Sequence, residues 1–192
     1  MIRRLYDWTL SFADTRYAML VLFLVSFAES SVFPIPPDIL MIPMILAAPH
    51  RAWLIAGVCT LASVLGGGAG YYIGAQLFEV IGQPVLELYG KADKFDVFAQ
   101  NFNETGPWAV LFAGITPFPY KVITIASGAT GLDFGVFMVS SVVARGLRFF
   151  LVAALLWKFG PPIRTFIEKR FGLMTLVFFA LLFGGFAAIR LL

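Results

Sequence analysis

The stretch FAESSVFPIPPDILMIPMILAA, residues 27–48, limits the fold more than any other part of the chain, because it places prolines and acids inside an apolar run. Spanning about 30 Å of hydrocarbon takes about 20 apolar residues in a helix. The flanking apolar pieces, Tyr17–Ala28 and Ile39–Ala48, would be only about 18 and 15 Å long. Because proline removes a backbone donor and clashes with the preceding turn, no regular helix can join them. The segment is predicted to be one broken spanning helix or two half-helices in a re-entrant hairpin.

The composition indicates that this broken segment lies in a membrane. The chain has 192 residues, of which 60% are hydrophobic and 13% charged, whereas soluble domains have roughly 45–50% apolar and 25% charged residues. Irregular backbone at membrane depth is tolerated where protein or water covers it. We therefore expect an all-α integral membrane protein with a single membrane domain, residues 1–192.

A second proline-broken segment repeats the order of the first. PFPYK (Pro117–Lys121) follows PIPPD (Pro34–Asp38) at an offset of 83 residues, and each precedes a long apolar run, Trp53–Ile81 or Phe134–Trp157. Repeats of a broken hairpin plus a spanning helix are typical of transporters, whose binding sites lie where the breaks meet. The residues expected to break the helices are Pro34, Pro36, Pro37, Pro117 and Pro119.

This pattern predicts four parts: repeat 1 at about 17–82, a polar connector at 83–106, repeat 2 at about 107–158 and a C-terminal transmembrane helix at about 171–190. The first residues are expected to form an interfacial amphipathic helix, because apolar side chains recur there at helical spacing. Re-entrant and fully spanning broken segments both satisfy the positive-inside bias. The short half-helices favour hairpins, with a cytoplasmic N-terminus in a bacterial inner membrane.

Gly66, Gly70 and Gly74 recur every four residues in the first long apolar run. They fall on one helix face, where the missing side chains allow another helix to approach closely. A nucleotide-binding loop is a poorer interpretation, since no strand precedes the glycines and no Lys-Ser or Lys-Thr follows them. We therefore predict a helix-packing face.

Ionisable residues inside membrane segments are costly and mark functional sites unless they snorkel to the interface or simply pair with each other. Two acids and three cations that converged would leave one positive charge, which suits a phosphate group bound by arginine. Asp38 and Lys121 hold the same position in the two breaks, so we hypothesise that they lie close together. Glu29 is the first candidate for a proton-responsive group. The predicted substrate-binding residues are Glu29, Asp38, Lys121, Arg145 and Arg148.

Other classes of function are disfavoured. Cys59 is the only cysteine and His50 the only histidine, so neither a disulfide nor a structural zinc site is expected. An intramembrane enzyme would need a nucleophile–base pair or a metal cluster. The net charge of +3 forms no basic face free of apolar residues, so nucleic acid is not an expected partner. We expect no enzyme activity, metal or cofactor.

The motifs FAESSVFPIPPDIL, GITPFPYKVITIASGATG and ARGLRFF resemble those of the DedA family, also described as SNARE-associated or VTT-domain proteins. The resemblance covers roughly residues 27–150 and implies two re-entrant hairpins in an inverted repeat, with a role in moving lipids between leaflets and proton-coupled function. It makes Glu29 and Asp38 the family's membrane acids. Lys121 stands where many members have arginine, and Ile115 stands where many have another arginine. Arg145 or Arg148 is expected to supply that missing cation.

The predicted function is translocation, as a flippase or scramblase, of a phosphate-bearing lipid such as undecaprenyl phosphate or a phospholipid, coupled to protons through an acid. The expected partners are membrane lipids with anionic or phosphate headgroups, and a homo-oligomer is left open. Two alternatives stay open: a proton-coupled transporter of a small solute, and a structural membrane protein that organises partners through its glycine face.

Overall fold

The structure, a computed structural model, describes residues 17–31, 36–88, 90, 92–116, 119–160 and 162, and every regular element in these ranges is helical. The prediction of an all-α chain is therefore confirmed. Pro34, Pro117, the N-terminal interfacial helix and the helix at about 171–190 lie outside the described residues. In chain order the elements are α2 (Ala18–Ser31), α3 (Asp38–Ala47), the 3-10 turn η1 (Pro49–Arg51), α4 (Ala52–Leu77), the π-helical η2 (Phe78–Gly82), α5 (Gln83–Leu88), α6 (Ala92–Ile115), α7 (Tyr120–Ala129) and a last helix, Phe134–Gly160.

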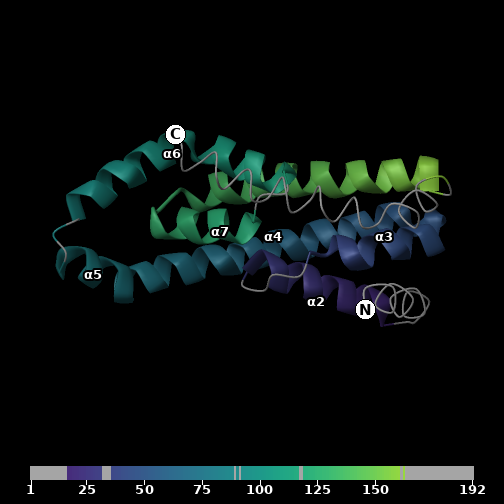
Figure 1. Cartoon of the computed structure of the whole chain (residues 1–192), viewed down its shortest axis with the longest axis horizontal. Helices are drawn as coiled ribbons and strands as arrows, with labels where there is room; N and C mark the ends of the chain where they lie inside the picture. The colour runs from purple at the N-terminus through teal and green to yellow at the C-terminus, as the bar shows by residue number, and fades with distance from the viewer. Residues whose placement is uncertain are drawn as a thin grey trace.

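The first broken segment folds into two short helices, α2 and α3, called here the first hairpin. Pro37 immediately precedes α3 with φ −65°, the angle that proline already holds and that suits a helix start. The N-terminal end of α2 lies at the end of the molecule where α3 finishes and α4 begins (Figure 1). Ala18, Ala52 and Leu156 accordingly share one buried apolar cluster. The chain therefore enters and leaves this hairpin at one end of the molecule.

The second broken segment, α6 and α7, is arranged the other way round and is called here the second hairpin. α6 begins at the opposite end of the molecule, and α7 returns toward that end before the last helix starts (Figure 1). Gly131 makes the turn between α7 and the last helix with φ +67°, a conformation that glycine adopts without steric cost. The two hairpins thus open toward opposite ends.

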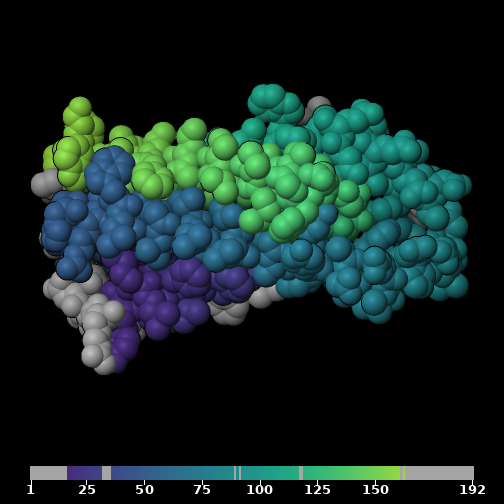
Figure 2. All heavy atoms as spheres, turned by 180° about the vertical axis from the view of Figure 1, so that it is seen from behind, coloured from purple at the N-terminus to yellow at the C-terminus, as the bar shows by residue number. Residues whose placement is uncertain are grey.

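Two continuous helices form the centre. Pro49–Leu88 has 40 residues, Phe134–Gly160 has 27, and both are long and apolar enough to cross a membrane. They run in opposite directions, and α4 lies between α2 and the last helix (Figures 1 and 2). At 1.5 Å per residue the first helix is about 60 Å long, twice the hydrocarbon thickness of a bilayer. Its far end therefore projects beyond the other helices.

The projecting end contains η2, α5 and the first half of α6, and is called here the arm (Figure 2). It covers the stretch expected to be a polar connector, and it is largely helical. Phe78 stacks on Phe95 with ring centroids 4.3 Å apart, which joins the two sides of the arm. The second half of α6, which contains Pro107, lies beyond the arm and leads to the break before α7.

The glycine face of α4 packs against both hairpins. A Cβ atom on Gly66 would meet the carbonyl group of Phe27 on α2, and one on Gly74 would meet the carbonyl group of Ile125 on α7. A Cβ on Gly70 would lie 2.5 Å from the Thr124 hydroxyl oxygen. Because backbone rather than a flexible side chain closes two of these contacts, even alanine would push the helices apart. The glycines thus allow both hairpins to reach the centre of α4.

Candidate functional site

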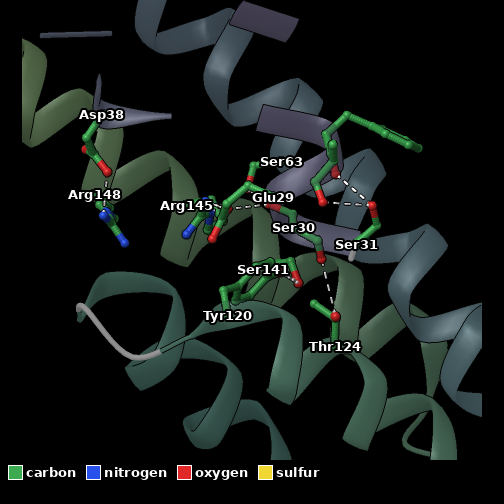
Figure 3. Close-up of polar contacts among 12 residues, drawn as sticks. Glu29, Ser30, Ser31, Asp38, Ser63, Tyr120, Thr124, Ser141, Arg145 and Arg148 are labelled. Carbon is green, nitrogen blue, oxygen red and sulfur yellow. Dashed lines mark hydrogen bonds and ion pairs between the residues drawn. The ribbon is translucent and has the colours of Figure 1, made fainter. Parts of the chain in front are cut away.

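Two ion pairs connect the break of the first hairpin to the last helix (Figure 3). Arg145 Nη2 lies 3.1 Å from Glu29 Oε2, and Arg148 Nη2 lies 2.7 Å from Asp38 Oδ2. The acids come from either side of the break, at the end of α2 and the start of α3, whereas both arginines come from one face of one helix. The arginines are three residues apart, so the helical spacing aims them in similar directions.

The inner pair is deeply buried. The Arg145 side chain is 1% exposed and that of Glu29 is 16% exposed. Arg145 Nε also donates to the Ser63 hydroxyl at 2.5 Å. Its guanidinium carbon lies 4.7 Å from the ring centroids of both Tyr120 and Phe149. Guanidinium–aromatic contacts of this kind stabilise a desolvated cation by up to about 2 kcal/mol each.

A line of hydroxyl groups extends this inner pair into the surrounding helices. The Ser30 and Ser63 hydroxyl oxygens are 2.6 Å apart, and Ser30 also donates to Glu29 Oε2 at 3.1 Å. Thr124 of α7 donates to the Ser30 carbonyl oxygen at 3.4 Å, so the two hairpins touch here. Tyr120 donates to the Ser141 hydroxyl at 2.5 Å. Buried polar groups cost free energy unless they are bonded, and this network satisfies them.

The outer pair is more open. The side chains of Arg148 and Asp38 are 22% and 21% exposed. Arg148 Nη1 donates to the Thr116 carbonyl oxygen, 3.3 Å away, at the break of the second hairpin. Arg148 therefore connects the two breaks, as Arg145 does through Glu29 and the ring of Tyr120. The two arginines thus join the hairpins in addition to the direct contact between Thr124 and Ser30.

Four of the five charges expected from the sequence meet in these pairs, and the fifth does not. Lys121 lies half-buried in the first turn of α7 and makes no ion pair with any residue that the structure describes. Asp38 pairs with Arg148 rather than with Lys121, and the hypothesis that Asp38 lies close to Lys121 stays a prediction. The reason is tertiary: Phe149, Ala153 and Leu156 of the last helix share one buried apolar cluster with residues of α3.

Sequence reasoning missed the polar residues that hold Arg145. Ser63 lies in an uncharged apolar run and was not singled out, although a lone serine among small residues is a recognisable signal for an interhelical contact. Tyr120 directly precedes Lys121 in the quoted motif, and an aromatic residue beside a proline break carries no signal of its own. Ser141 lies four residues before Arg145, on the same helix face.

The charged groups of the site leave one positive charge in excess. The two ion pairs are neutral, and Lys121 adds a positive charge beside the second break. Arg148 offers donors in a planar fork that matches phosphate or carboxylate oxygens. Within the described ranges, no group of three or more His, Cys, Asp or Glu side chains is placed to hold a metal ion.

Comparison with known proteins gives consistent matches. The family model of the VTT domain matches residues 35–158. The chain is 36% identical over 168 residues to an uncharacterized protein of Haemophilus influenzae, covering 85% of this chain and 87% of that protein. It is 38% identical over 168 residues to an uncharacterized protein of Histophilus somni, with the same coverage. It is 28% identical over 134 residues to an uncharacterized protein of Methanocaldococcus jannaschii, covering 69% of this chain and 79% of the relative. No solved structure gives a significant match.

Proposed function

Because the chain belongs to the DedA family of VTT-domain membrane proteins, we propose that it moves a phosphate-bearing lipid between the leaflets of a bacterial inner membrane. One observation carries the proposal: two acid–arginine pairs lie at the centre of the helices and join both proline-broken hairpins. Charges at such depth are costly and mark transport pathways in other membrane proteins. A phosphate headgroup would need such polar groups to cross, while its tail stays in lipid.

The aromatic residues support a position for the bilayer. Trp53 stacks on Phe150 and contacts Trp157 at one end, whereas Tyr72 contacts Phe134 at the other. Trp and Tyr are enriched at both membrane interfaces. Trp53 and Tyr72 are 19 residues apart on α4, or about 28 Å, which matches a hydrocarbon layer of about 30 Å.

In this placement the ion pairs lie near the bilayer midplane. Ser63 follows Trp53 by ten residues along α4, which is about 15 Å or half of the span. Arg145 lies close to halfway between Phe134 and Trp157 on the last helix. Both hairpins would then be re-entrant, each entering from one face and turning near the midplane, as in transporters with inverted repeats.

The distribution of charge supports a cytoplasmic N-terminus. Arg51 and Lys158 lie at the Trp53 end of the two long helices. Arg3, Arg4 and Arg16 precede α2, which begins at this same end, whereas the arm's stretch of sequence at the other end contains two basic residues, Lys91 and Lys94. Basic residues favour the cytoplasmic side. The arm would therefore stand on the outer face of the membrane. The acidic residues of the arm are Glu79, Glu87, Asp93, Asp96 and Glu104.

Protonation offers a way to couple such movement to a proton gradient. A proton on Glu29 or Asp38 would remove the negative charge from one ion pair and free its arginine for another anion. Because both arginines contact both hairpins, releasing one would also loosen the hairpins from each other. Coupling requires that the two states differ in their affinity for the lipid and for the proton.

Reconstitution tests this function. Vesicles of phosphatidylcholine containing tail-labelled fluorescent phosphatidate, with and without the purified full chain, are exposed to a membrane-impermeant quencher. The proposal predicts that the protein exposes the inner-leaflet label to the quencher faster than in empty vesicles. Equal rates would refute lipid translocation. Uptake of a water-soluble phosphate ester without lipid movement would favour a small-solute transporter instead.

A further inference from the structure

The two ion pairs differ in how firmly they are held, although they lie one helical turn apart. Arg145 lies over the rings of both Tyr120 and Phe149, and its nitrogens donate to Ser63 and Glu29. An incoming anion would have to displace several of these groups at once. Arg145 is therefore a fixed part of the site.

Arg148 is held by fewer contacts. It donates to Asp38 and to the Thr116 carbonyl oxygen, and its guanidinium carbon lies 5.9 Å from the Phe149 ring centroid. An arginine has five N–H donors, and about a fifth of this side chain is exposed. An anion can therefore reach Arg148 without disturbing the buried network.

The Asp38 carboxylate is held by fewer hydrogen bonds than the Glu29 carboxylate. Glu29 accepts hydrogen bonds from both Arg145 and Ser30. The Asp38 carboxylate accepts from Arg148 and from no other side chain in the described part of the chain. Exchanging Asp38 for another anion thus breaks one interaction, whereas removing Glu29 breaks two and leaves Arg145 as an unpaired buried charge.

We propose that Arg148 binds the phosphate group of the lipid by displacing Asp38, while the Arg145–Glu29 pair stays closed and keeps the hairpins together. This assignment rests on the proposed function, because it names the headgroup-binding residue of that site. Two phosphate oxygens can accept bidentate bonds from the guanidinium fork. The released Asp38 is a carboxylate at the break, with a side chain that is 21% exposed. Asp38 therefore acts as a competitor that keeps the empty site neutral.

Binding of short-chain lipid to the detergent-purified full chain tests the exchange. The probes are dihexanoyl phosphatidate, inorganic phosphate and, as a zwitterionic control, dihexanoyl phosphatidylcholine, each titrated by calorimetry. We expect phosphatidate to bind and phosphatidylcholine to bind more weakly. Binding of inorganic phosphate alone would mean that the site takes the free anion, and would overturn the assignment to a lipid.

The variants of the two acids are expected to differ in their effect on binding. Asp38→Asn removes the competitor and is expected to tighten phosphatidate binding by about tenfold, because a hydrogen bond to a charged group is worth about that factor. Glu29→Gln is expected to give no tightening. Arg148→Gln should lose binding. Arg148→Lys should retain part of the binding, and it serves as the second variant if Arg148→Gln does not fold. Glu104→Gln on the arm is the charge-matched control.

Tightening by both acid variants alike would indicate general electrostatics and overturn the exchange. Unchanged binding in Arg148→Gln would also overturn it. Because these measurements do not require transport, they separate the two proposals. Binding with the expected signs but no lipid movement in vesicles would refute only the proposed function. Lipid movement without tightening in Asp38→Asn would refute only the exchange.

Discussion

Arg145 and Arg148 lie one helical turn apart on the last helix, and each of them contacts both broken segments of the chain. The first hairpin supplies a carboxylate to each, Glu29 to one and Asp38 to the other. The second hairpin supplies an aromatic ring to one and a backbone carbonyl to the other. Any movement of one hairpin relative to the other must therefore change the contacts of at least one arginine.

Neutralising one partner of the inner pair is expected to destabilise the fold. Glu29→Gln leaves the Arg145 guanidinium buried without a counter-charge, and losses of about 3–5 kcal/mol follow when such pairs are broken. The partial exposure of Glu29 puts the expected loss near the lower end of that range. The double variant Glu29→Gln/Arg145→Gln should lose less than the sum of the single variants. Unfolding of the detergent-purified protein by heat or denaturant measures this, and strict additivity would contradict the pairing.

The ring of Tyr120 is expected to stabilise the Arg145 cation through a cation–π interaction rather than through packing alone. The reference is Tyr120→Phe, which already lacks the hydroxyl bond to Ser141. Phenylalanines that carry one, two and three fluorines at this position then weaken the negative face of the ring at nearly constant size. The melting temperature should fall stepwise, by about 4 °C across the series. The matched control is the same series at Phe137, which is fully buried and has no cation over its ring among the described residues. A flat response at Tyr120, or equal slopes at both positions, would argue against a cation–π contact.

Gly74→Ala is expected to separate α4 from α7, because the new Cβ would overlap the Ile125 carbonyl group. Overpacking of this kind typically costs about 1–3 kcal/mol. Gly57→Ala on the same helix is the control, since a Cβ there meets nothing within 4 Å. Thermal unfolding of the two variants should show a loss for Gly74→Ala alone. A stable Gly74→Ala protein would mean that the two helices are not in backbone contact.

The arm is expected to be exposed to water outside the bilayer. In a Cys59→Ala background, Lys94→Cys should react with a membrane-impermeant maleimide added to the outside of intact cells. Leu61→Cys, on α4 between Trp53 and Tyr72, should stay unlabelled although the native leucine side chain is 57% exposed. Labelling of position 94 only after the cells are opened would reverse the proposed orientation.

The sequence predicted the broken helices well because proline acts locally. Helices were expected over Tyr17–Ala28 and Ile39–Ala48 and occur over Ala18–Ser31 and Asp38–Ala47. The family was recognised from the same motifs and is confirmed by the match to residues 35–158. Glycine lacks a side chain and proline lacks a backbone donor, and both constrain a helix wherever it lies. The effect of these residues could therefore be predicted without tertiary information.

The pairing of charges could not be read in the same way. The offset between the repeats suggested that Asp38 faces Lys121, but the partner of a charge depends on which helix packs beside it. The last helix brings Arg148 to the first break and leaves Lys121 outside any ion pair in the described ranges. The contact of Arg145 with the ring of Tyr120 likewise depends on the packing of α7, which no local pattern predicts.

Lipid movement in reconstituted vesicles, compared between the native protein and Arg148→Gln, tests the central claim most directly. The claim is that the cation joining the two breaks binds the phosphate group as it crosses the bilayer. The native protein should move labelled phosphatidate at least about tenfold faster than the variant, which corresponds to one lost charged hydrogen-bond contact, with both proteins folded and equally incorporated. Equal rates for the two proteins would contradict the claim.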